Sequence, residues 1–421
     1  MNKTQIILLV FLMFSLNLQA QKPILFIGGT AHLGNGKSIE NSAISILNGE
    51  FELVANASKI RINPEAFDTI YRIQGKHIYP GFIAPNSTLG ITEIGAIRAS
   101  HDYRETGNIN PNVRSLIAYN TESKIIKTVR TNGILIAQIS PQGGLISGQS
   151  SIMYLDGSNW EDAQLKSDDG IHVNWPSSYY STGWWAQPGE IKENEEYENK
   201  IQEIKHVFDK AYAYYQSSSL IDLRLESMKG LFNGNKTLYI YSNQANDIRD
   251  AIEFTNKFKI KKTVLVGGEE ALEIKKLLKQ NNISLILNRI HRLPNNQDSP
   301  IDGPYSQPSK LQEAGITFCL SYEGDMEAMG TRNLPFTAGT TVAYGQKYEN
   351  AVMSLTLNAA KILGIDHRVG SIEKGKEATF FISTGDALDI KTNNVEKAFI
   401  KGKEVDLNNH QIELFNKYKD K

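Results

Sequence analysis

The chain has 421 residues, of which 40% are hydrophobic and 22% charged, so it is long enough for one large globular domain and a smaller one. Its 45 basic and 46 acidic side chains leave a formal net charge of -1. This balance excludes a general electrostatic attraction to nucleic acid or to acidic membranes, and we expect small molecules or other proteins as partners.

The first twenty residues have the pattern of a secretory signal peptide. Lys3 supplies a positive start, the run ILLVFLMF supplies an apolar core, and Ala20 is a small residue before a cleavage site. The apolar run is shorter than the roughly 20 residues that span a bilayer, and no second hydrophobic stretch follows it. We therefore expect a secreted or periplasmic protein, cleaved near Ala20, without a membrane span.

Short β-type runs follow this segment and return near the C-terminus. PILFIGGTAHL, SAISILNGEFELVA and TIYRIQGKHIY come first, and ATFFISTG and VEKAFIKGKEV come last. The dipeptide of Asn48 and Gly49 is the strongest hairpin signal among them. We expect both chain ends, residues 21–78 and 369–415, to build one small β-sandwich domain.

The middle of the chain alternates between strand and helix patterns. Buried strands are predicted at residues 81–84, 133–140, 150–155, 171–175, 237–242, 262–268, 284–290 and 316–322. Helical patterns lie between several of these strands, at residues 121–133, 193–216, 246–259, 269–281 and 309–315. This alternation predicts an α/β fold with a parallel sheet, closed as a (β/α)8 TIM-type barrel over residues 79–368, with its site where strand C-termini meet loops.

Two long connections, residues 90–120 and 176–190, do not fit a minimal barrel. They are rich in Pro, Gly and aromatic residues, and long loops in compact domains tend to be functional or mobile. Aromatic side chains gather at the second connection: Trp175, Tyr179, Tyr180, Trp184 and Trp185. They either form a platform for a ligand or partner chain or pack against the barrel.

Six segments carry a family resemblance that runs over nearly all of the chain after the first twenty residues. They are GKHIYPGFI (75–83), ISPQGGLISGQSSIM (139–153), GIHVNWP (170–176), NDIRDAIEF (246–254), RNLPFTAG (332–339) and LTLNAAKILGIDHRVGSIEKGKEATF (355–380). On these segments the sequence resembles the amidohydrolase superfamily, specifically its secreted branch similar to imidazolonepropionase. The resemblance implies hydrolysis of carbon–nitrogen bonds of the cyclic amide type, with a divalent metal such as zinc.

The sequence departs from this family at the metal-ligand positions. The family's first barrel strand ends in Asp-x-His-x-His, whose imidazoles share one face of an extended segment. Alignment on residues 80–83 places these three positions at Ala84, Asn86 and Thr88. The remaining signature positions, two histidines and an aspartate, fall on Tyr241, on Gly267 or Gly268, and on Tyr322. Amide and hydroxyl oxygens are weak zinc ligands beside imidazole, so we predict a degenerate metal site and assign no metal ligand.

Other residues would have to carry the chemistry of an enzyme. The catalytic candidates are Asp325, Tyr241, His172 and His291, and the candidates for substrate binding are Asn174, Trp175, Tyr322, Asn86 and Thr88. Asp325 either replaces the signature aspartate in a shifted loop or is a solvated loop residue. His172 and His291, with His101 and Asp102, either rebuild a zinc site or are separate hydrogen-bonding residues of loops and core.

Two hypotheses about function stay open. In the first, the chain is a hydrolase that works with rebuilt metal ligands or without metal. In the second, the barrel has lost its metal and its catalysis and serves as a binding or partner subunit. In either case a small molecule is the expected ligand, and the chain associates with copies of itself or with a related amidohydrolase chain.

Overall fold

The structure is a computed structural model, and it describes residues 22–184, 187, 189–217, 220–294, 299–323 and 327–420. The expected signal peptide, Trp185 and the candidate Asp325 lie outside the described residues. Within the described ranges, no helix is both long and apolar enough to cross a membrane.

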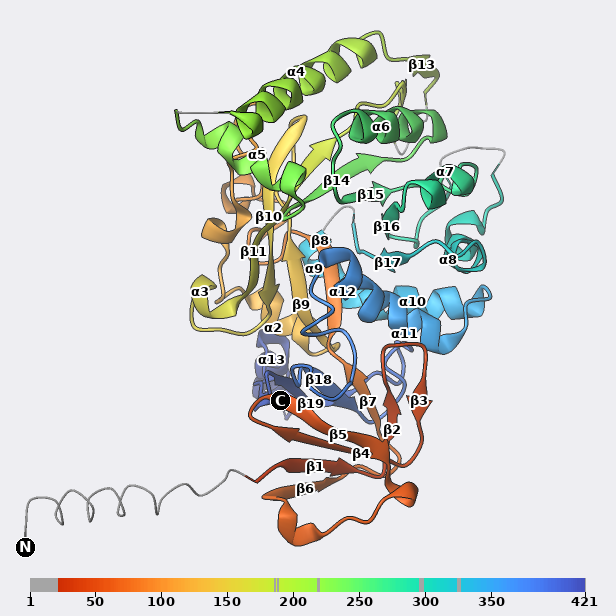
Figure 1. Cartoon of the computed structure of the whole chain (residues 1–421). Coiled ribbons are helices and arrows are strands. Elements are labelled where there is room, and N and C mark those ends of the chain that lie inside the picture. Colours follow the sequence, from red (N-terminus) through yellow and green to blue (C-terminus); the bar gives the residue numbers. More distant parts are fainter. Residues whose placement is uncertain are drawn as a thin grey trace, which may run out of the picture.

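The terminal β-type runs form two sheets, of which the first contains N-terminal strands only and the second contains strands from both ends of the chain (Figure 1). The first has the order β5 (Glu50–Asn56), β4 (Ser42–Leu47), β1 (Ile24–Ile27) and β6 (Thr69–Arg72). The second has the order β20 (Lys403–Glu404), β19 (Val395–Ile400), β18 (Phe380–Ser383), β7 (His77–Pro80), β2 (Thr30–His32) and β3 (Ser38–Ile39). Asn48 and Gly49 both have positive φ between β4 and β5, which is the geometry of the predicted hairpin turn.

One apolar core joins these terminal sheets. Phe26 of the first sheet meets Phe380 and Phe399 of the second edge-on, with ring centroids 5.2 and 5.3 Å apart. Phe380 and Phe399 stack on each other at 4.7 Å. The N-terminal and C-terminal segments therefore hold each other in place through buried aromatic side chains.

All eight predicted barrel strands are present in a third sheet. Its order is β17 (Phe318–Leu320), β16 (Ser284–Leu287), β15 (Thr263–Gly267), β14 (Thr237–Ser242), β11 (Gln164–Asn174), β10 (Ile146–Tyr154), β9 (Ile134–Ile139) and β8 (Phe82–Ser87). The two outer strands, β17 and β8, approach each other, so the sheet nearly closes into a TIM-like barrel.

The prediction of a wholly parallel sheet is wrong at one strand. β10 runs antiparallel to both β9 and β11. The chain passes from β9 to β10 through residues 140–145. A parallel neighbour needs a crossover of about a dozen residues or more, so this short turn can only return the chain in the opposite direction.

Helices cover the outside of the barrel sheet, mainly over its β11 to β17 half (Figure 1). The five predicted helices correspond to α2 (Lys124–Arg130), α4 (Tyr197–Gln216), α6 (Ala245–Lys257), α7 (Lys275–Gln280) and α8 (Gly303–Glu313). The structure adds α3 (Trp160–Ala163), α5 (Leu223–Asn233), α9 (Glu327–Gly330), α10 (Leu334–Ala343), α11 (Tyr348–Leu355), α12 (Leu357–Leu363) and α13 (His410–Tyr418). Of these, α5 has clear end signals, since the Asp222 side chain caps its first turn and Gly234 ends it at φ +89°.

The two long connections contain little regular structure. Residues 90–120 hold two 3-10 turns, Arg98–Ser100 and Ser115–Ala118. The second connection leads into a hairpin of β12 (Tyr179–Ser181) and β13 (Ile191–Glu193). Both follow C-terminal ends of barrel strands, β8 and β11, and so border the barrel mouth.

Candidate functional site

A buried polar network occupies the inner side of the barrel sheet. Asp169 of β11 is 1% exposed and accepts hydrogen bonds from Ser150 Oγ at 2.7 Å, Tyr239 OH at 2.7 Å and Gln138 Nε2 at 2.9 Å. Burial raises the pKa of the Asp169 carboxyl. The three donors come from β10, β14 and β9, so this single carboxylate connects four strands.

Three of the predicted site residues contact one another at the next level toward the mouth. The Tyr241 hydroxyl hydrogen-bonds Asn86 Oδ1, and it lies 2.8 Å from His172 Nδ1. Because the hydroxyl has one hydrogen and gives it to an amide oxygen, His172 must donate from Nδ1. Burial lowers the pKa of His172 to about 3, so the ring is neutral, and its Nε2 has no hydrogen-bond partner among the described residues.

The residues at the family's metal-ligand positions do not fit a zinc centre. Asn86 and Tyr241 present an amide and a phenol to each other, whereas zinc sites use imidazole, thiolate and carboxylate. A side chain cannot replace Gly267, because its φ is +101° and a Cβ would lie 2.3 Å from Asn243 Oδ1. In the part of the chain that the structure describes, no three His, Cys, Asp or Glu side chains are grouped as metal ligands.

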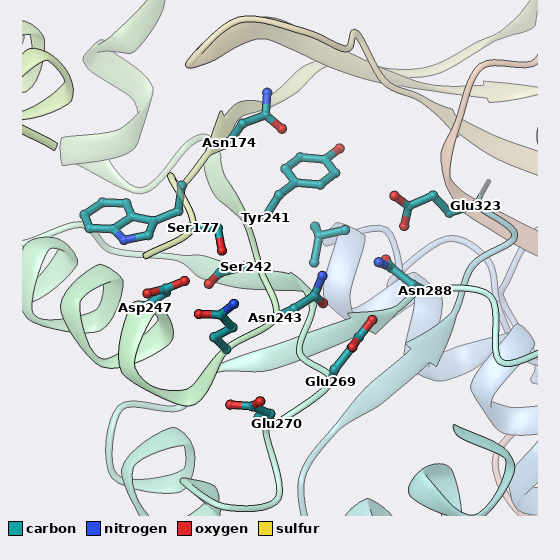
Figure 2. A pocket seen from close by; sticks show the side chains of 13 residues that line it. Asn174, Ser177, Tyr241, Ser242, Asn243, Asp247, Glu269, Glu270, Asn288 and Glu323 are labelled. Carbon is teal, nitrogen blue, oxygen red and sulfur yellow. The ribbon is translucent and has the colours of Figure 1, made fainter. Parts of the chain in front are cut away.

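A cavity of about 430 Å³ lies at the C-terminal ends of β11, β14, β15 and β16 (Figure 2). This is where a barrel of this type is expected to hold its site. Three predicted residues, Asn174, Trp175 and Tyr241, line it. Four carboxylates also line it: Asp247, Glu269, Glu270 and Glu323. We call this space the acidic cavity.

The four carboxylates of the acidic cavity differ in their partners. Glu269 pairs with Arg292 at 3.0 Å, and Glu270 accepts the backbone N–H of Ala245 at 2.8 Å. Asp247 is 2% exposed, and its Oδ2 accepts the backbone N–H of Ser178 at 3.2 Å. Burial raises the pKa of Asp247, and burial together with nearby Glu269 raises the pKa of Glu323.

A second cavity, of about 550 Å³, lies on the β8 side of the mouth against residues 92–103. Buried Glu327 faces it and accepts the backbone N–H of Thr88 at 3.1 Å and Gln142 Nε2 at 3.0 Å. Burial raises the pKa of Glu327 to about 8, and the charge of Glu323 adds to this shift. Glu327 therefore gains and loses its proton near neutral pH.

The other predicted site residues are more dispersed. His291 Nε2 lies 2.7 Å from Thr340 Oγ1 and lines a separate cavity, so it does not join Tyr241. Asn174 donates to the Gly144 carbonyl at 2.7 Å, and Tyr322 packs its ring under the Arg289 guanidinium. Trp175 is buried against Phe254, whereas Tyr179, Tyr180 and Trp184 are exposed, so the described aromatic residues do not form one platform.

Several polar residues of the mouth were not among the predicted candidates: Asp169, Asp247, Glu323 and Glu327. Two of them had a signal in the sequence. Asp247 lies inside the matched segment at residues 246–254, and Glu323 directly follows the last predicted strand. Nothing comparable marks Glu327, because its burial depends on the packing of α9 against the mouth.

Comparison with known proteins agrees with this geometry. The model of the amidohydrolase family matches residues 190–405, more than half of the chain. Two curated relatives are named imidazolonepropionase. The protein from Flavobacterium psychrophilum is 25% identical over 253 residues, covering 55% of this chain and 59% of its own length. The protein from Syntrophobacter fumaroxidans is 30% identical over 82 residues, covering 19% of each. The chain thus spans about three fifths or less of the curated relatives it matches.

Solved structures show the same fold. An amidohydrolase from Thermotoga maritima MSB8 has a TM-score of 0.75 and 24% identity, over 91% of this chain and 99% of that one. A Xaa-Pro dipeptidase with bound methionine has a TM-score of 0.56 and 14% identity, over 91% and 100% of the two chains. With the family match over its second half and the barrel over its middle, the chain belongs to the amidohydrolase family.

Proposed function

We propose that this chain hydrolyses a carbon–nitrogen bond in a small cyclic amide or a related compound at the barrel mouth, without zinc at the family's ligand positions. Family membership supports the reaction class. The observation that carries the proposal is Glu327, a buried carboxyl with a pKa of about 8 that faces a cavity. Such a carboxyl can take a proton from water as it attacks a carbonyl carbon, and then return it to the leaving nitrogen.

Glu327 has the geometry of a positioned proton carrier. Its two oxygens accept from the Thr88 backbone and from Gln142, so the carboxyl is fixed in orientation. Thr88 lies at the end of β8, next to the sheet edge where β8 and β17 approach. Asn86 and Tyr241, at two of the aligned ligand positions, lie with His172 in the barrel, and in this proposal the three shape the substrate space rather than bind metal.

The test is turnover by the purified chain on a panel of cyclic amides and dipeptides. The substitution Glu327→Gln keeps the shape and removes the titrating proton, and it should reduce kcat by about a hundredfold or more. Exposed Glu122 provides a matched Glu122→Gln control, which should leave kcat unchanged. Equal kcat for Glu327→Gln and the parent would contradict this role.

A second candidate is a binding barrel without catalysis. It is favoured by the hydrogen bonds of Tyr241 to Asn86 and His172, because Asn86 and Tyr241, at two of the aligned metal-ligand positions, contact each other. It predicts ligand binding without turnover across the whole panel. It also predicts a partner, either a second copy or a related amidohydrolase chain, which sedimentation of the chain alone and with that relative would detect.

The proposal of a degenerate metal centre has its own measurement. Elemental mass spectrometry of protein purified without chelators or a histidine tag should show much less than one zinc, manganese or iron per chain. Near-stoichiometric metal would mean that other residues, such as the predicted candidates His172, His291 and Asp325, have rebuilt a site.

We further propose that the protein is secreted or periplasmic, with cleavage near Ala20, which N-terminal sequencing of protein recovered outside the cytoplasm would test. We also propose a small β-sandwich domain at residues 21–78 and 369–415 beside a barrel domain at residues 79–368. The aromatic core shared by the two terminal sheets supports this division. Two separate unfolding transitions in urea, one for each domain, would support this division, and a single transition would contradict it.

A further inference from the structure

The charged side chains that line the acidic cavity are all negative among the described residues. Four carboxylates line it, and no lysine or arginine is among the described residues that do so. Arg292 neutralises Glu269 at 3.0 Å, and Arg289 lies beside the cavity over the Tyr322 ring. These two arginines offset part of the negative charge, and Asp247 and Glu323 remain as the carboxylates without a cationic partner within ion-pair distance in the described chain.

Among the described residues that line this cavity, the unmet hydrogen bonds are all acceptors, while the Nε donor of Arg289 beside the cavity also lacks a partner. Asp247 Oδ1 and Glu323 Oε2 have no donor among the described residues, although Asp247 is only 2% exposed. The amide oxygens of Asn243 and Asn288 lack a donor as well. A buried acceptor without a donor costs free energy, and a charged one costs more. The cavity therefore lacks donors, and a ligand that fits it must supply them.

Figure 2 shows Asp247 and Glu323 on different sides of the labelled side chains, with Tyr241 and Ser242 between them. Trp175 and Tyr241 add aromatic surface to the lining. The face of an aromatic ring carries partial negative charge, so it attracts a cation as a carboxylate does. The volume of about 430 Å³ suits a molecule of roughly ten heavy atoms at the small end of ligand pockets.

We propose that the acidic cavity binds a cationic nitrogen group, an ammonium or an amidinium or guanidinium, at the carboxylate of Asp247, while the carboxylate of Glu323 adds negative potential from the other side of the cavity. Planar amidinium and guanidinium groups match a carboxylate with two parallel N–H donors, and so they satisfy both the charge and the missing donors. An anionic ligand would meet four carboxylates instead. This proposal adds to the proposed function the charge of the substrate. It rests on the proposed function in one respect, the position of the substrate at the barrel mouth.

The test compares three probes of one shape and different charge: benzamidine, benzamide and benzoate. Isothermal titration at neutral pH and low salt should give binding of benzamidine that is about tenfold or more tighter than that of benzamide, with benzoate weakest. Binding should also release protons and not take them up, measured in two buffers of different ionisation heat, because a bound cation lowers the pKa values of Asp247 and Glu323. Equal affinities for the three probes, or no benzamidine binding at millimolar concentration, would overturn the proposal.

Two isosteric substitutions locate the binding. Asp247→Asn should weaken benzamidine binding about tenfold or more, and Glu323→Gln should weaken it about threefold; Asp247→Asn still has an oxygen to accept the Ser178 N–H. Glu122→Gln, on the exposed surface, should have no effect. Thermal melting of each variant separates lost binding from lost folding, and Glu323→Gln repeats the test on a second element if Asp247→Asn does not fold. Binding of benzamidine that neither substitution changes would show that the cation binds elsewhere.

The failures of the two proposals are distinguishable. Turnover of neutral cyclic amides, with no preference for cationic probes, would retain the proposed hydrolase and remove the cationic ligand. Benzamidine binding that depends on Asp247, without turnover of any compound, would retain the cationic ligand and favour the binding barrel.

Discussion

The terminal sheets and the barrel mouth bury their side chains for different purposes. Between the terminal sheets, Phe26, Phe380 and Phe399 fill the core with aromatic contacts between 4.7 and 5.3 Å. On the inner side of the barrel, Asp169 and Tyr241 are buried with hydrogen bonds to several strands. One core is apolar and the other polar, although a single chain folds around both.

The difference follows from what each kind of burial gains. Apolar surface gains about 25 cal/mol for each Å² removed from water. A buried hydrogen-bonded group gains only about 1 kcal/mol net, and a buried charge at best offsets its desolvation. The terminal core is therefore explained by stability alone. Stability alone does not explain the buried polar groups of the barrel, and we assign those that line the acidic cavity to ligand binding.

The largest expected effect is on the apolar core. Phe380 is fully buried, and Phe380→Ala should lower the free energy of unfolding by about 3–5 kcal/mol, because the cavity left behind cannot close. Urea denaturation measures this loss, and Phe380→Leu should cost less than half as much. Benzamidine affinity should remain unchanged while the chain is folded. A parallel loss of binding would mean that the terminal core and the mouth are not independent.

The next effect is on the polar interior. Asp169→Ala removes the common acceptor of Ser150, Gln138 and Tyr239, and it should cost about 3 kcal/mol because these buried donors lose their partner. Asp169→Asn keeps an acceptor oxygen and should cost less. Urea denaturation of both variants gives the comparison. If alanine proved no worse than asparagine, the network would not depend on these hydrogen bonds.

A smaller effect depends on pH. Glu327 has a folded-state pKa of about 8, above the ordinary glutamate value of 4.5, so the folded chain binds this proton more tightly than the unfolded chain does. Its contribution to stability is full below about pH 4.5 and is lost as the pH rises through 8. Glu327→Gln removes this dependence, so between about pH 6 and pH 8 the variant should gain about 2 kcal/mol relative to the parent.

Melting temperatures of parent and variant across that range test the sign. Asp247 and Glu323 also have raised pKa values and shift the stability of the parent in the same direction, so the difference between the two curves reports Glu327 together with its interaction with Glu323. The melting temperature of the Glu122→Gln variant should follow that of the parent at every pH. A flat difference curve between about pH 6 and pH 8 would show that Glu327 is already charged in the folded chain, and it would contradict the raised pKa.

The strands could be predicted from the sequence better than their directions. Each barrel strand is a run of buried apolar residues, and such a run has the same pattern whichever way it points. The direction of β10 follows instead from the length of the connection at residues 140–145, which is too short for the crossover that a parallel strand requires. The chain ends paired as expected because β-type runs there had hairpin turns and no helices between them.

Site residues could be predicted from the sequence where the family pattern identifies their positions. Residues whose role depends on being buried could not be predicted in this way. Alignment identified Asn86 and Tyr241, which the structure joins through a hydrogen bond. His172 was identified from its place at a predicted strand end, and it joins them. Asp247 and Glu327 were missed because a carboxylate is usually solvated, and only the packing of α6 and α9 makes these two buried.

The smallest expected effect is on the β12–β13 hairpin, which belongs to neither core. Tyr180 is 50% exposed there, so Tyr180→Ala should change the free energy of unfolding by less than about 0.5 kcal/mol. Urea denaturation and sedimentation velocity together check it. If stability is unchanged but a dimer dissociates, the exposed aromatic residues of the hairpin form a subunit contact. If stability falls by as much as it does in Phe380→Leu, the hairpin packs into a third core, and the division of the molecule into one apolar and one polar interior fails.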